Sequence, residues 1–291
     1  PSPTGKLHLG GARTALFNYL HAKSNNGSFK VRIEDTDKSR NITQTSQEIL
    51  ESLNWLGFEV DGPVIFQSKN IKKHLEVANS LILNGLAYKC FHDDNYITGK
   101  KKSKQKFVSE WRDCKKQKPN KPYCIRIKAP LNGNYTLEDK VQGKIVVNFH
   151  ELDDYIIVRT DKPPTFLLSS VVDDVEMKIS DIIRGDDHLT NTFRQKIIFD
   201  FLNYKPNFAH ISLLHNSQNQ KMSKRDNSVS VLDYKNKGYL PGALNNYLLR
   251  LGWSYGDKEL FSLKEAVEFF SISNLGKSPA KLDEKKLIFL N

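Results

Sequence analysis

The chain has 291 residues, of which 38% are hydrophobic, so it can bury a sizeable core and is not disordered as a whole. Lysine and arginine number 44 against 33 acidic residues, and the net charge of +11 favours a polyanionic partner such as nucleic acid. No apolar run is long enough to span a bilayer and no signal peptide is recognisable, so no membrane association is expected. The 3 cysteines are odd in number and clustered, which argues against a disulfide scaffold and favours an intracellular, cytoplasmic location.

The first part of the sequence alternates helix-like and strand-like segments. Residues 10–20 carry apolar side chains at helical spacing, and residues 29–33 alternate with the period of a strand. The alternation continues with a helix expected at 43–56, a strand at 64–66 and a helix at 70–84. This order predicts a parallel sheet with helices on both faces, that is, an α/β, doubly wound Rossmann-type fold.

The middle of the chain has a different composition. Between residues 100 and 128, twelve lysines and arginines accompany two acidic residues, so a charge of about +10 lies in this stretch. Strand signals follow at 123–128, 144–149 and 155–159. The pattern predicts an inserted α+β lobe with a basic face, although a solvated lysine loop explains the same composition equally well.

Regular β/α order resumes near residue 165, and the later part of the chain is helical. The expected elements are strands at 179–184 and 208–214, and helices at 189–203, 241–251, 262–270 and 280–290. We therefore predict three parts: a discontinuous catalytic domain of residues 1–69 and 165–230, an inserted lobe of residues 70–164, and a helical stem-contact domain of residues 231–291.

Two short segments are candidates for nucleotide chemistry. Residues 1–11 run through His8 and a Gly-Gly pair into a helix, whose free N–H groups can bind phosphate oxygens. Residues 221–225 place three cations around a serine, which suits a clamp on the negative charge of phosphoryl or nucleotidyl transfer. Neither segment fits the dinucleotide or P-loop motif, and taken alone each is better explained as an ordinary loop or a solvated basic turn.

Taken together, the ordered motifs resemble those of bacterial-type glutamyl-tRNA synthetases, which are class I aminoacyl-tRNA synthetases. The resemblance covers nearly the whole chain. It is carried by residues 1–18, 31–37, 171–174, 183–188, 221–225, 238–241 and 251–254. It implies that ATP and L-glutamate react to give glutamyl-adenylate and pyrophosphate, and that the glutamyl group then passes to the 3′ end of tRNA(Glu).

The resemblance also implies which residues bind ATP. His8, Lys221 and Lys224 match catalytic positions, and Lys224 is the best candidate for stabilising the phosphates in the transition state. The further nucleotide contacts implied are Gly10, Gly11, Asp187 and Leu214. Mg²⁺ is expected to accompany ATP as its counterion, with no dedicated set of protein ligands.

For glutamate, the resemblance implies one cation and one acid. Arg184 matches the position that pairs with the side-chain carboxylate, and Glu34 the position that binds the ammonium group. Ser2, Phe166 and Ser170 fall on other positions near the amino acid. Phe166 stands where the family typically has a tyrosine, so one hydroxyl donor is lost there.

The basic lobe is expected to bind the acceptor stem of tRNA through its phosphates. The contacts we predict are Lys100, Lys101, Lys102 and Lys104. Some family members hold zinc in this lobe, but two of the matched ligand positions are Trp111 and Asp113 here. Cys90, His92 and Cys114 alone do not complete a tetrahedral site, so zinc is not expected.

Two alternatives remain open at this stage. A glutamyl-queuosine tRNA(Asp) synthetase-type paralogue has a suitable length, but such paralogues usually have a degraded form of the segment that is intact at 221–225. A non-catalytic RNA-binding module explains the basic lobe, but it has no use for two nucleotide-binding segments. The family's first strand, which supplies a substrate-binding arginine, is missing before residue 1. We therefore predict a portion of a longer, monomeric synthetase, not fully active as it stands.

Overall fold

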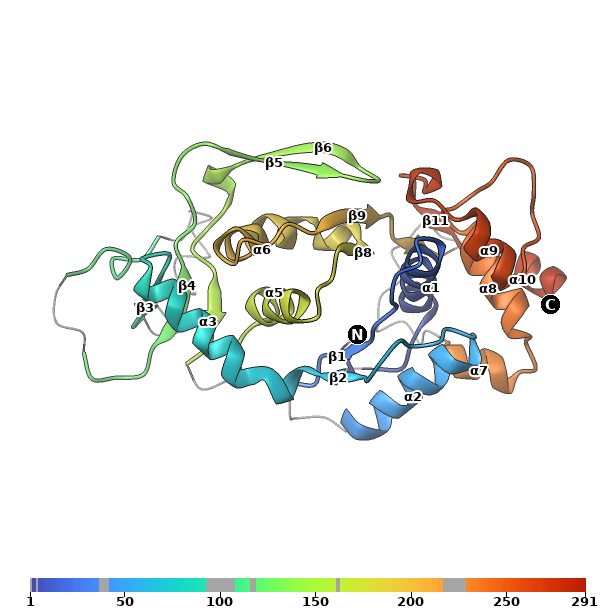
Figure 1. The fold of residues 1–291 in the computed structure, drawn as a ribbon, viewed down its shortest axis with the longest axis horizontal. Coiled ribbons are helices and arrows are strands. Elements are labelled where there is room, and N and C mark those ends of the chain that lie inside the picture. Colours follow the sequence, from blue (N-terminus) through green and yellow to red (C-terminus); the bar gives the residue numbers. More distant parts are fainter. Residues whose placement is uncertain are drawn as a thin grey trace.

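The structure is a computed structural model, which describes residues 2–3, 5–36, 42–92, 108–115, 119–160, 163–216 and 229–291. Its central helix is α1 (Leu9–Ser24), which begins directly after His8. Helix α1 lies between a sheet that contains β8 (Asp181–Gly185) and the C-terminal helices (Figure 1). Its inward face buries apolar residues at helical spacing, so the helix predicted from periodicity is confirmed.

Parallel strand pairs form the framework around α1. Strand β1 (Arg32–Ile33) pairs with β2 (Ile65–Phe66), and β8 pairs with β9 (Asn207–Ile211). A third parallel pair joins β10 (Leu214–His215) to β11 (Ala280–Lys281). The helices that follow the strands are α2 (Ile42–Trp55), α3 (Ile71–Leu83), α5 (Phe166–Glu176) and α6 (Leu189–Phe201).

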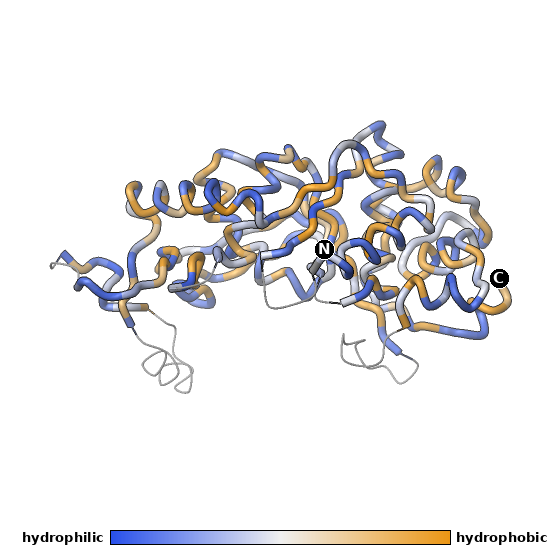
Figure 2. Tube along the Cα trace, turned by 90° about the horizontal axis from the view of Figure 1, so that it is seen from below, coloured by the Kyte–Doolittle hydropathy of each residue, from blue (hydrophilic) through white to orange (hydrophobic). Residues whose placement is uncertain are grey.

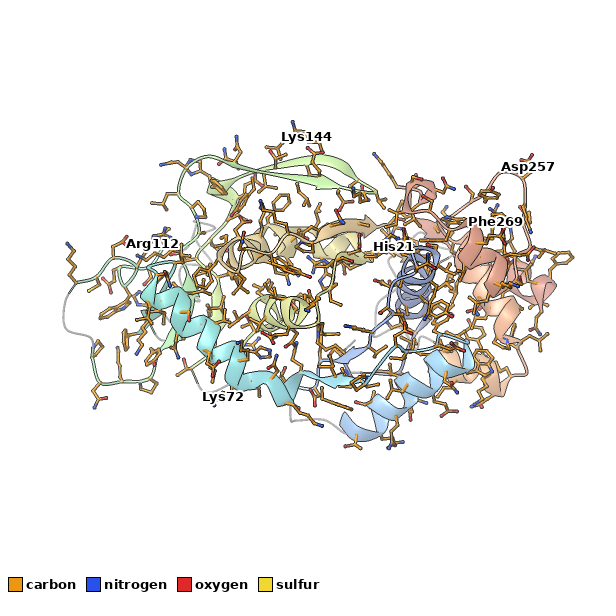
Figure 3. All side chains as sticks on the ribbon, viewed as in Figure 1. His21, Lys72, Arg112, Lys144, Asp257 and Phe269 are labelled. Atoms are coloured by element: carbon orange, nitrogen blue, oxygen red, sulfur yellow. The ribbon has the colours of Figure 1, made fainter. Side chains whose placement is uncertain are left out.

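The segment between α3 and α5 contains two antiparallel units. One is a sheet of β3 (Ala87–Cys90), β4 (Cys124–Ile127) and β7 (Ile156–Val158). The other is a hairpin of β5 (Asn134–Asp139) and β6 (Gly143–Asn148), which continues the β8–β9 sheet in the order β6-β5-β9-β8 (Figure 1). On the hairpin, Lys144 of β6 is exposed and points away from the body of the protein (Figure 3).

Helices α7 (Val231–Asn236), α8 (Pro241–Arg250), α9 (Leu263–Phe269) and α10 (Glu284–Leu290) make up the C-terminal part. The helix expected at 280–290 is wrong at its start, because Ala280 and Lys281 pair with β10. The helix begins only after Asp283, whose carboxylate accepts hydrogen bonds from the N–H groups of Lys285 and Lys286.

Two large hydrophobic cores and one small cluster around Cys90 and Cys124 form among the described residues. The first joins α1, α2 and β1 to the C-terminal helices, and the second joins α3, β4 and β7 to α5 and α6. Hydrophobic and hydrophilic residues are interspersed along the trace in the regions of both cores (Figure 2). The division into three domains stays a prediction. Helices α5 and α6, which were assigned to the catalytic domain, share a hydrophobic core with elements of the predicted inserted lobe.

Among the described residues, no helix combines the length and the apolar character needed to cross a membrane.

Arg13 ties α1 to the C-terminal part, and we expect its loss to destabilise the fold. The side chain is only 2% exposed, and it donates to the carbonyl of Leu251 at 2.7 Å and to that of Ser212. Burial lowers the pKa of Arg13 to about 10, against the opposing effect of Asp186. Arg13→Met would leave two buried carbonyls without their donor, so we expect chemical denaturation to show a loss of about 2 kcal/mol.

The exposed Arg159 offers a matched control for this measurement. Arg159→Met should change the free energy of unfolding by less than about 0.5 kcal/mol. A similarly small loss for Arg13→Met would contradict the bridging role.

Candidate active site

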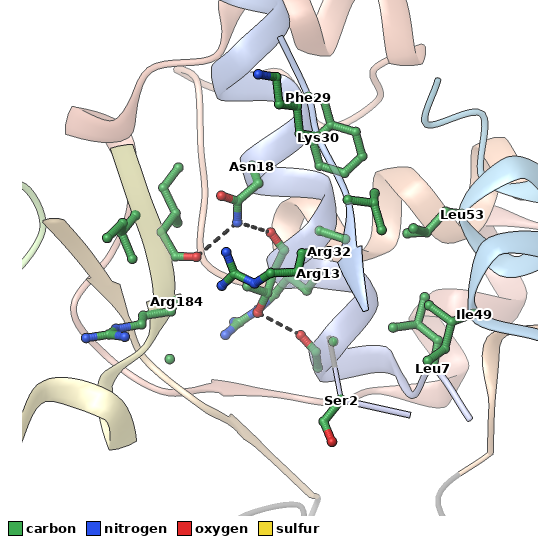
Figure 4. Close-up of a pocket in the computed structure, with 18 of the residues that line it drawn as sticks. Ser2, Leu7, Arg13, Asn18, Phe29, Lys30, Arg32, Ile49, Leu53 and Arg184 are labelled. Atoms are coloured by element: carbon green, nitrogen blue, oxygen red, sulfur yellow. Dashed lines mark hydrogen bonds between the residues drawn. The ribbon is translucent and has the colours of Figure 1, made fainter. Parts of the chain in front are cut away.

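One cavity of about 1740 Å³ collects the described residues that the sequence singled out for nucleotide and amino-acid binding. It is bordered by α1, β1, α5 and β8, and Figure 4 shows Ser2, Arg32 and Arg184 around it. The predicted site residues that line it are Ser2, His8, Gly10, Gly11, Glu34, Phe166, Ser170, Arg184, Asp187 and Leu214. Their individual roles stay predictions. The predicted residues Lys221, Lys224, Lys100, Lys101, Lys102 and Lys104 lie outside the described residues.

At one end of the cavity, His8 caps the N-terminus of α1. Its ring Nδ1 accepts a hydrogen bond from the backbone N–H of Gly11 at 3.3 Å, which in the neutral ring leaves the proton on Nε2. A Cβ at Gly11 would lie 2.9 Å from Leu7 Cδ1, and one at Gly10 would lie 3.3 Å from the His8 ring. Gly10 therefore leaves room for the His8 ring, and Gly11 for the Leu7 side chain, at the helix end, whose partial positive charge favours an anion.

A third glycine shapes the end of β8. A Cβ at Gly185 would lie 2.6 Å from Asp187 Oδ1 and 3.0 Å from Leu213 Cδ2. The missing side chain at Gly185 leaves room for the Asp187 carboxylate to lie over the strand end, where Asp187 lines the cavity. Sequence reasoning included Gly185 in a motif but did not assign it this role.

Arg184 is a half-buried cation on β8 with no carboxylate within ion-pair distance among the described residues. Its Nη2 donates to Thr192 Oγ1 at 2.6 Å and to Gln195 Oε1 at 2.7 Å, and its Nε donates to His210 Nε2 at 3.3 Å. Burial lowers its pKa to about 10, and the more distant carboxylate of Asp174 is the strongest opposing influence.

A guanidinium group has five N–H donors, so two remain on Arg184 Nη1 after these three hydrogen bonds. A charged group that is buried in a cavity without an ion pair is typical of a binding site for an ion of opposite sign. The geometry around Arg184 therefore fits a carboxylate ligand.

Another arginine that lines the cavity, Arg32, is already neutralised by acids. Its Nη1 lies 2.6 Å from Asp174 Oδ1, its Nη2 lies 3.5 Å from Glu34 Oε1, and its Nε lies 3.7 Å from Asp173 Oδ2. Burial lowers the pKa of Arg32, but Asp174 and Glu34 outweigh it and the net shift is upward. Arg32 and Arg184 therefore differ in their charge partners. Arg32 is held in an ion-pair network, whereas the Nη1 donors of Arg184 are left for a ligand. In the sequence, Arg32 was noticed only as part of the motif at 31–37, and no role was predicted for it.

Helix α5 brings Phe166 and Ser170 into the same cavity, one turn apart. The Phe166 ring meets the His188 ring edge-on, with centroids 5.5 Å apart. Ser170 Oγ donates to the Phe166 carbonyl at 2.5 Å and accepts from Gln195 Nε2 at 2.6 Å. Gln195, which sequence reasoning missed, therefore links Ser170 to Arg184.

The region predicted to lack zinc has an apolar character. Cys90 and Cys124 are directly opposed on β3 and β4, and the Trp111 ring packs edge-on against Phe91 at 5.0 Å. Within the described ranges, no group of three or more His, Cys, Asp or Glu side chains is arranged to hold a metal ion.

The parallel strand pairs, the helix that starts beneath His8 and the cavity between them define a Rossmann-type nucleotide-binding domain. The family described as "tRNA synthetases class I (E and Q), catalytic domain" matches residues 1–289. The chain therefore belongs to this family, and the resemblance noted from its motifs and the α/β fold class are both confirmed.

Similar proteins agree with this assignment. The chain is 48% identical to "Glutamate--tRNA ligase 2" of Ehrlichia chaffeensis and to "Glutamate--tRNA ligase" of Pelagibacter ubique, in each case over 100% of its own length. It spans only 64% of each of these curated relatives. The crystal structure of a glutamate tRNA ligase from Elizabethkingia meningosepticum, in complex with its amino acid, superimposes with a TM-score of 0.89 at 31% identity. That match covers 100% of this chain and 67% of the other.

Proposed function

We propose that this chain is the catalytic portion of a glutamate–tRNA ligase, which activates L-glutamate with ATP and transfers it to the 3′ end of tRNA(Glu). The observation that carries the proposal is Arg184, a half-buried cation at the cavity wall that keeps two N–H donors for a carboxylate. Family membership and the names of the relatives support the same reaction. We further propose that the protein is monomeric and acts in the cytoplasm.

In the proposed mechanism, Arg184 Nη1 binds the side-chain carboxylate of glutamate. Glu34, whose carboxylate is half-buried at the cavity wall, binds the ammonium group. The α-carboxylate then attacks the α-phosphorus of ATP, and pyrophosphate leaves. The enzyme needs no covalent nucleophile, because positioning and electrostatic stabilisation supply the catalysis.

The phosphates of ATP fit the end of the cavity where α1 begins. His8 Nε2 and the first N–H groups of α1 are the donors that the structure offers there. Gly10, Gly11, Asp187 and Leu214 border the same space. Mg²⁺ would accompany ATP as its counterion and screen its phosphate charge. We infer from the sequence alone that Lys221 and Lys224 add positive charge to the leaving pyrophosphate.

The reaction is tested by ATP–pyrophosphate exchange with the protein in its full natural length. We expect exchange that depends on glutamate, and tRNA(Glu) has to be present in one arm because some glutamyl enzymes need tRNA to activate the amino acid. Absence of exchange in every arm would favour the non-catalytic RNA-binding module. Transfer of glutamate to tRNA(Asp) but not to tRNA(Glu) would favour the glutamyl-queuosine paralogue.

The tRNA contacts are tested by changing Lys100, Lys101, Lys102 and Lys104 to alanine together. Because these charges are proposed to neutralise phosphates, the variant should raise the KM for tRNA and flatten its dependence on salt. The slope of log KM against log salt should fall by up to about three, while the KM for ATP stays the same. An unchanged salt slope would remove these lysines from the tRNA interface.

Phe166→Tyr restores a hydroxyl at the wall of the cavity. A new hydrogen bond to glutamate is worth about 1 kcal/mol, so we expect the KM for glutamate to fall about fivefold. Steady-state exchange kinetics at saturating ATP measure this. No change in the KM for glutamate would show that the side chain at this position does not reach the substrate.

A further inference from the structure

Behind Arg184, a buried chain of polar groups runs into the β5–β6 hairpin. His210 on β9 places Nδ1 2.6 Å from Asp139 Oδ2, and its Nε2 lies 2.8 Å from Thr192 Oγ1. The side chains of Asp139 and His210 are both 0% exposed. Arg184 meets this chain at two points, because it donates to Thr192 Oγ1 and to His210 Nε2. Four elements thus converge behind one guanidinium group: β5, β9, α6 and β8.

The Asp139 carboxylate fixes which nitrogen of His210 carries the proton. An ionised carboxylate only accepts hydrogen bonds, so His210 Nδ1 must be the donor. In the neutral ring, Nε2 then carries a lone pair, which accepts from the Thr192 hydroxyl and from Arg184 Nε–H. Thr192 Oγ1 in turn accepts from Arg184 Nη2.

Asp139 is well held in its ionised form. Burial raises its pKa, but hydrogen bonds from His210 and from the backbone N–H groups of Gln142, His210 and Val141 outweigh burial, and the net shift is downward. The backbone N–H of His210 lies 3.1 Å from Asp139 Oδ1, so the contact also fixes β5 against β9.

We propose that Asp139 and His210 are positioning residues that orient Arg184, so that its two Nη1 N–H groups face a carboxylate substrate. This inference deepens the proposed function and rests on it. The β5–β6 hairpin lies in the lobe that was predicted to bind RNA. Under this proposal the hairpin also supports the amino-acid pocket. The acidic partner acts through the tautomer of His210 and does not touch the substrate.

Asp139→Asn tests the tautomer directly. The Asn carbonyl can still accept the backbone hydrogen bonds, but its NH₂ group would donate to His210 Nδ1 and move the ring proton to Nε2, which faces the Arg184 cation. We expect the KM for glutamate to rise about tenfold in exchange assays with tRNA(Glu). The KM for ATP and the inhibition constant of glutamine, which lacks the side-chain carboxylate, should each change by less than about twofold.

Glu138→Gln is the matched control. It likewise replaces a carboxylate by an amide, on the residue of β5 that directly precedes Asp139 and whose side chain is exposed. This variant should keep the wild-type KM for glutamate. A comparable rise in both variants would show that the hairpin acts only as a support and would overturn the proposal.

Thr192→Val provides a second test that does not alter β5. It removes the hydroxyl between His210 and Arg184 while nearly preserving side-chain volume. The KM for glutamate should again rise about tenfold, and the double variant with Asp139→Asn should show less than the product of the two effects, because both act on Arg184. If Asp139→Asn does not fold, this variant alone decides the matter.

An unchanged KM for glutamate in Thr192→Val, or equal changes in the kinetic constants for glutamate and ATP, would overturn the positioning role. These outcomes are distinct from failure of the proposed function, because that would appear as the absence of glutamate-dependent exchange in the wild-type protein.

Discussion

Arg184→Met is expected to lower kcat/KM for glutamate at least about 100-fold, or roughly 3 kcal/mol of transition-state stabilisation. The guanidinium is a half-buried cation at the cavity wall with two N–H donors left for a carboxylate, and methionine replaces it with an apolar group of similar length. The KM for ATP should change little. Exchange kinetics at varied glutamate and at varied ATP separate the two effects.

Folding should not suffer in this variant, which separates a binding role from a structural one. The lowered pKa of Arg184 shows that burial disfavours its charged form, so the folded protein holds the cation against a desolvation cost. Methionine removes this cost together with three hydrogen bonds, and because the two effects oppose each other we expect the midpoint of thermal unfolding to stay within about 5 °C of the wild type. A fall of more than about 5 °C would indicate that the hydrogen bonds to Thr192 and Gln195 serve stability first.

Two further variants sharpen the interpretation. Arg184→Lys keeps the charge but loses the planar fork that reaches Thr192, Gln195 and His210 together, so we expect a defect that exceeds about tenfold. Arg159→Met removes an exposed arginine and should leave the kinetics unchanged. Near-normal activity in Arg184→Met would contradict the proposed contact between Arg184 and glutamate.

His8→Asn is expected to reduce kcat for activation by about 100-fold without loss of stability. Asparagine is among the best N-cap residues, so its side-chain oxygen can replace His8 Nδ1 as acceptor for the Gly11 N–H. It does not replace the Nε2 donor beyond the helix end, which we propose contacts the phosphates of ATP. Removal of one such donor typically costs about 100- to 1,000-fold in kcat.

His8→Ala separates the two tasks of this side chain. It should show the same kinetic loss and, in addition, lose about 1 kcal/mol of stability with the cap. Thermal unfolding and exchange kinetics on the same preparations measure both. A wild-type rate in His8→Asn would mean that the histidine is only a cap, and the phosphate site would have to lie elsewhere in the cavity.

Much of the fold could be predicted from the sequence because its signals are local. Apolar periodicity placed α1, α3 and α6 within a few residues of their observed ends. Strands β3 and β5 were missed: β3 is short and almost wholly buried, whereas β5 alternates between exposed and more buried residues, a local signal that the sequence analysis overlooked. At 280–290 the helical pattern was extended over residues that pair with β10, a long-range contact that no local pattern reveals.

The sequence by itself determined the family, the alternation of helices and strands, and the set of residues that meet in the cavity, because each of these is written in short motifs. Only the tertiary structure decided what surrounds those residues. It paired Arg32 with Asp174, which lies 142 positions away, and brought no carboxylate of the described residues within ion-pair distance of Arg184. It also placed Asp139 behind His210 across 71 positions. The charge state and orientation of a buried arginine depend on which distant side chains the fold packs around it, and spacing along the chain carries no record of that packing.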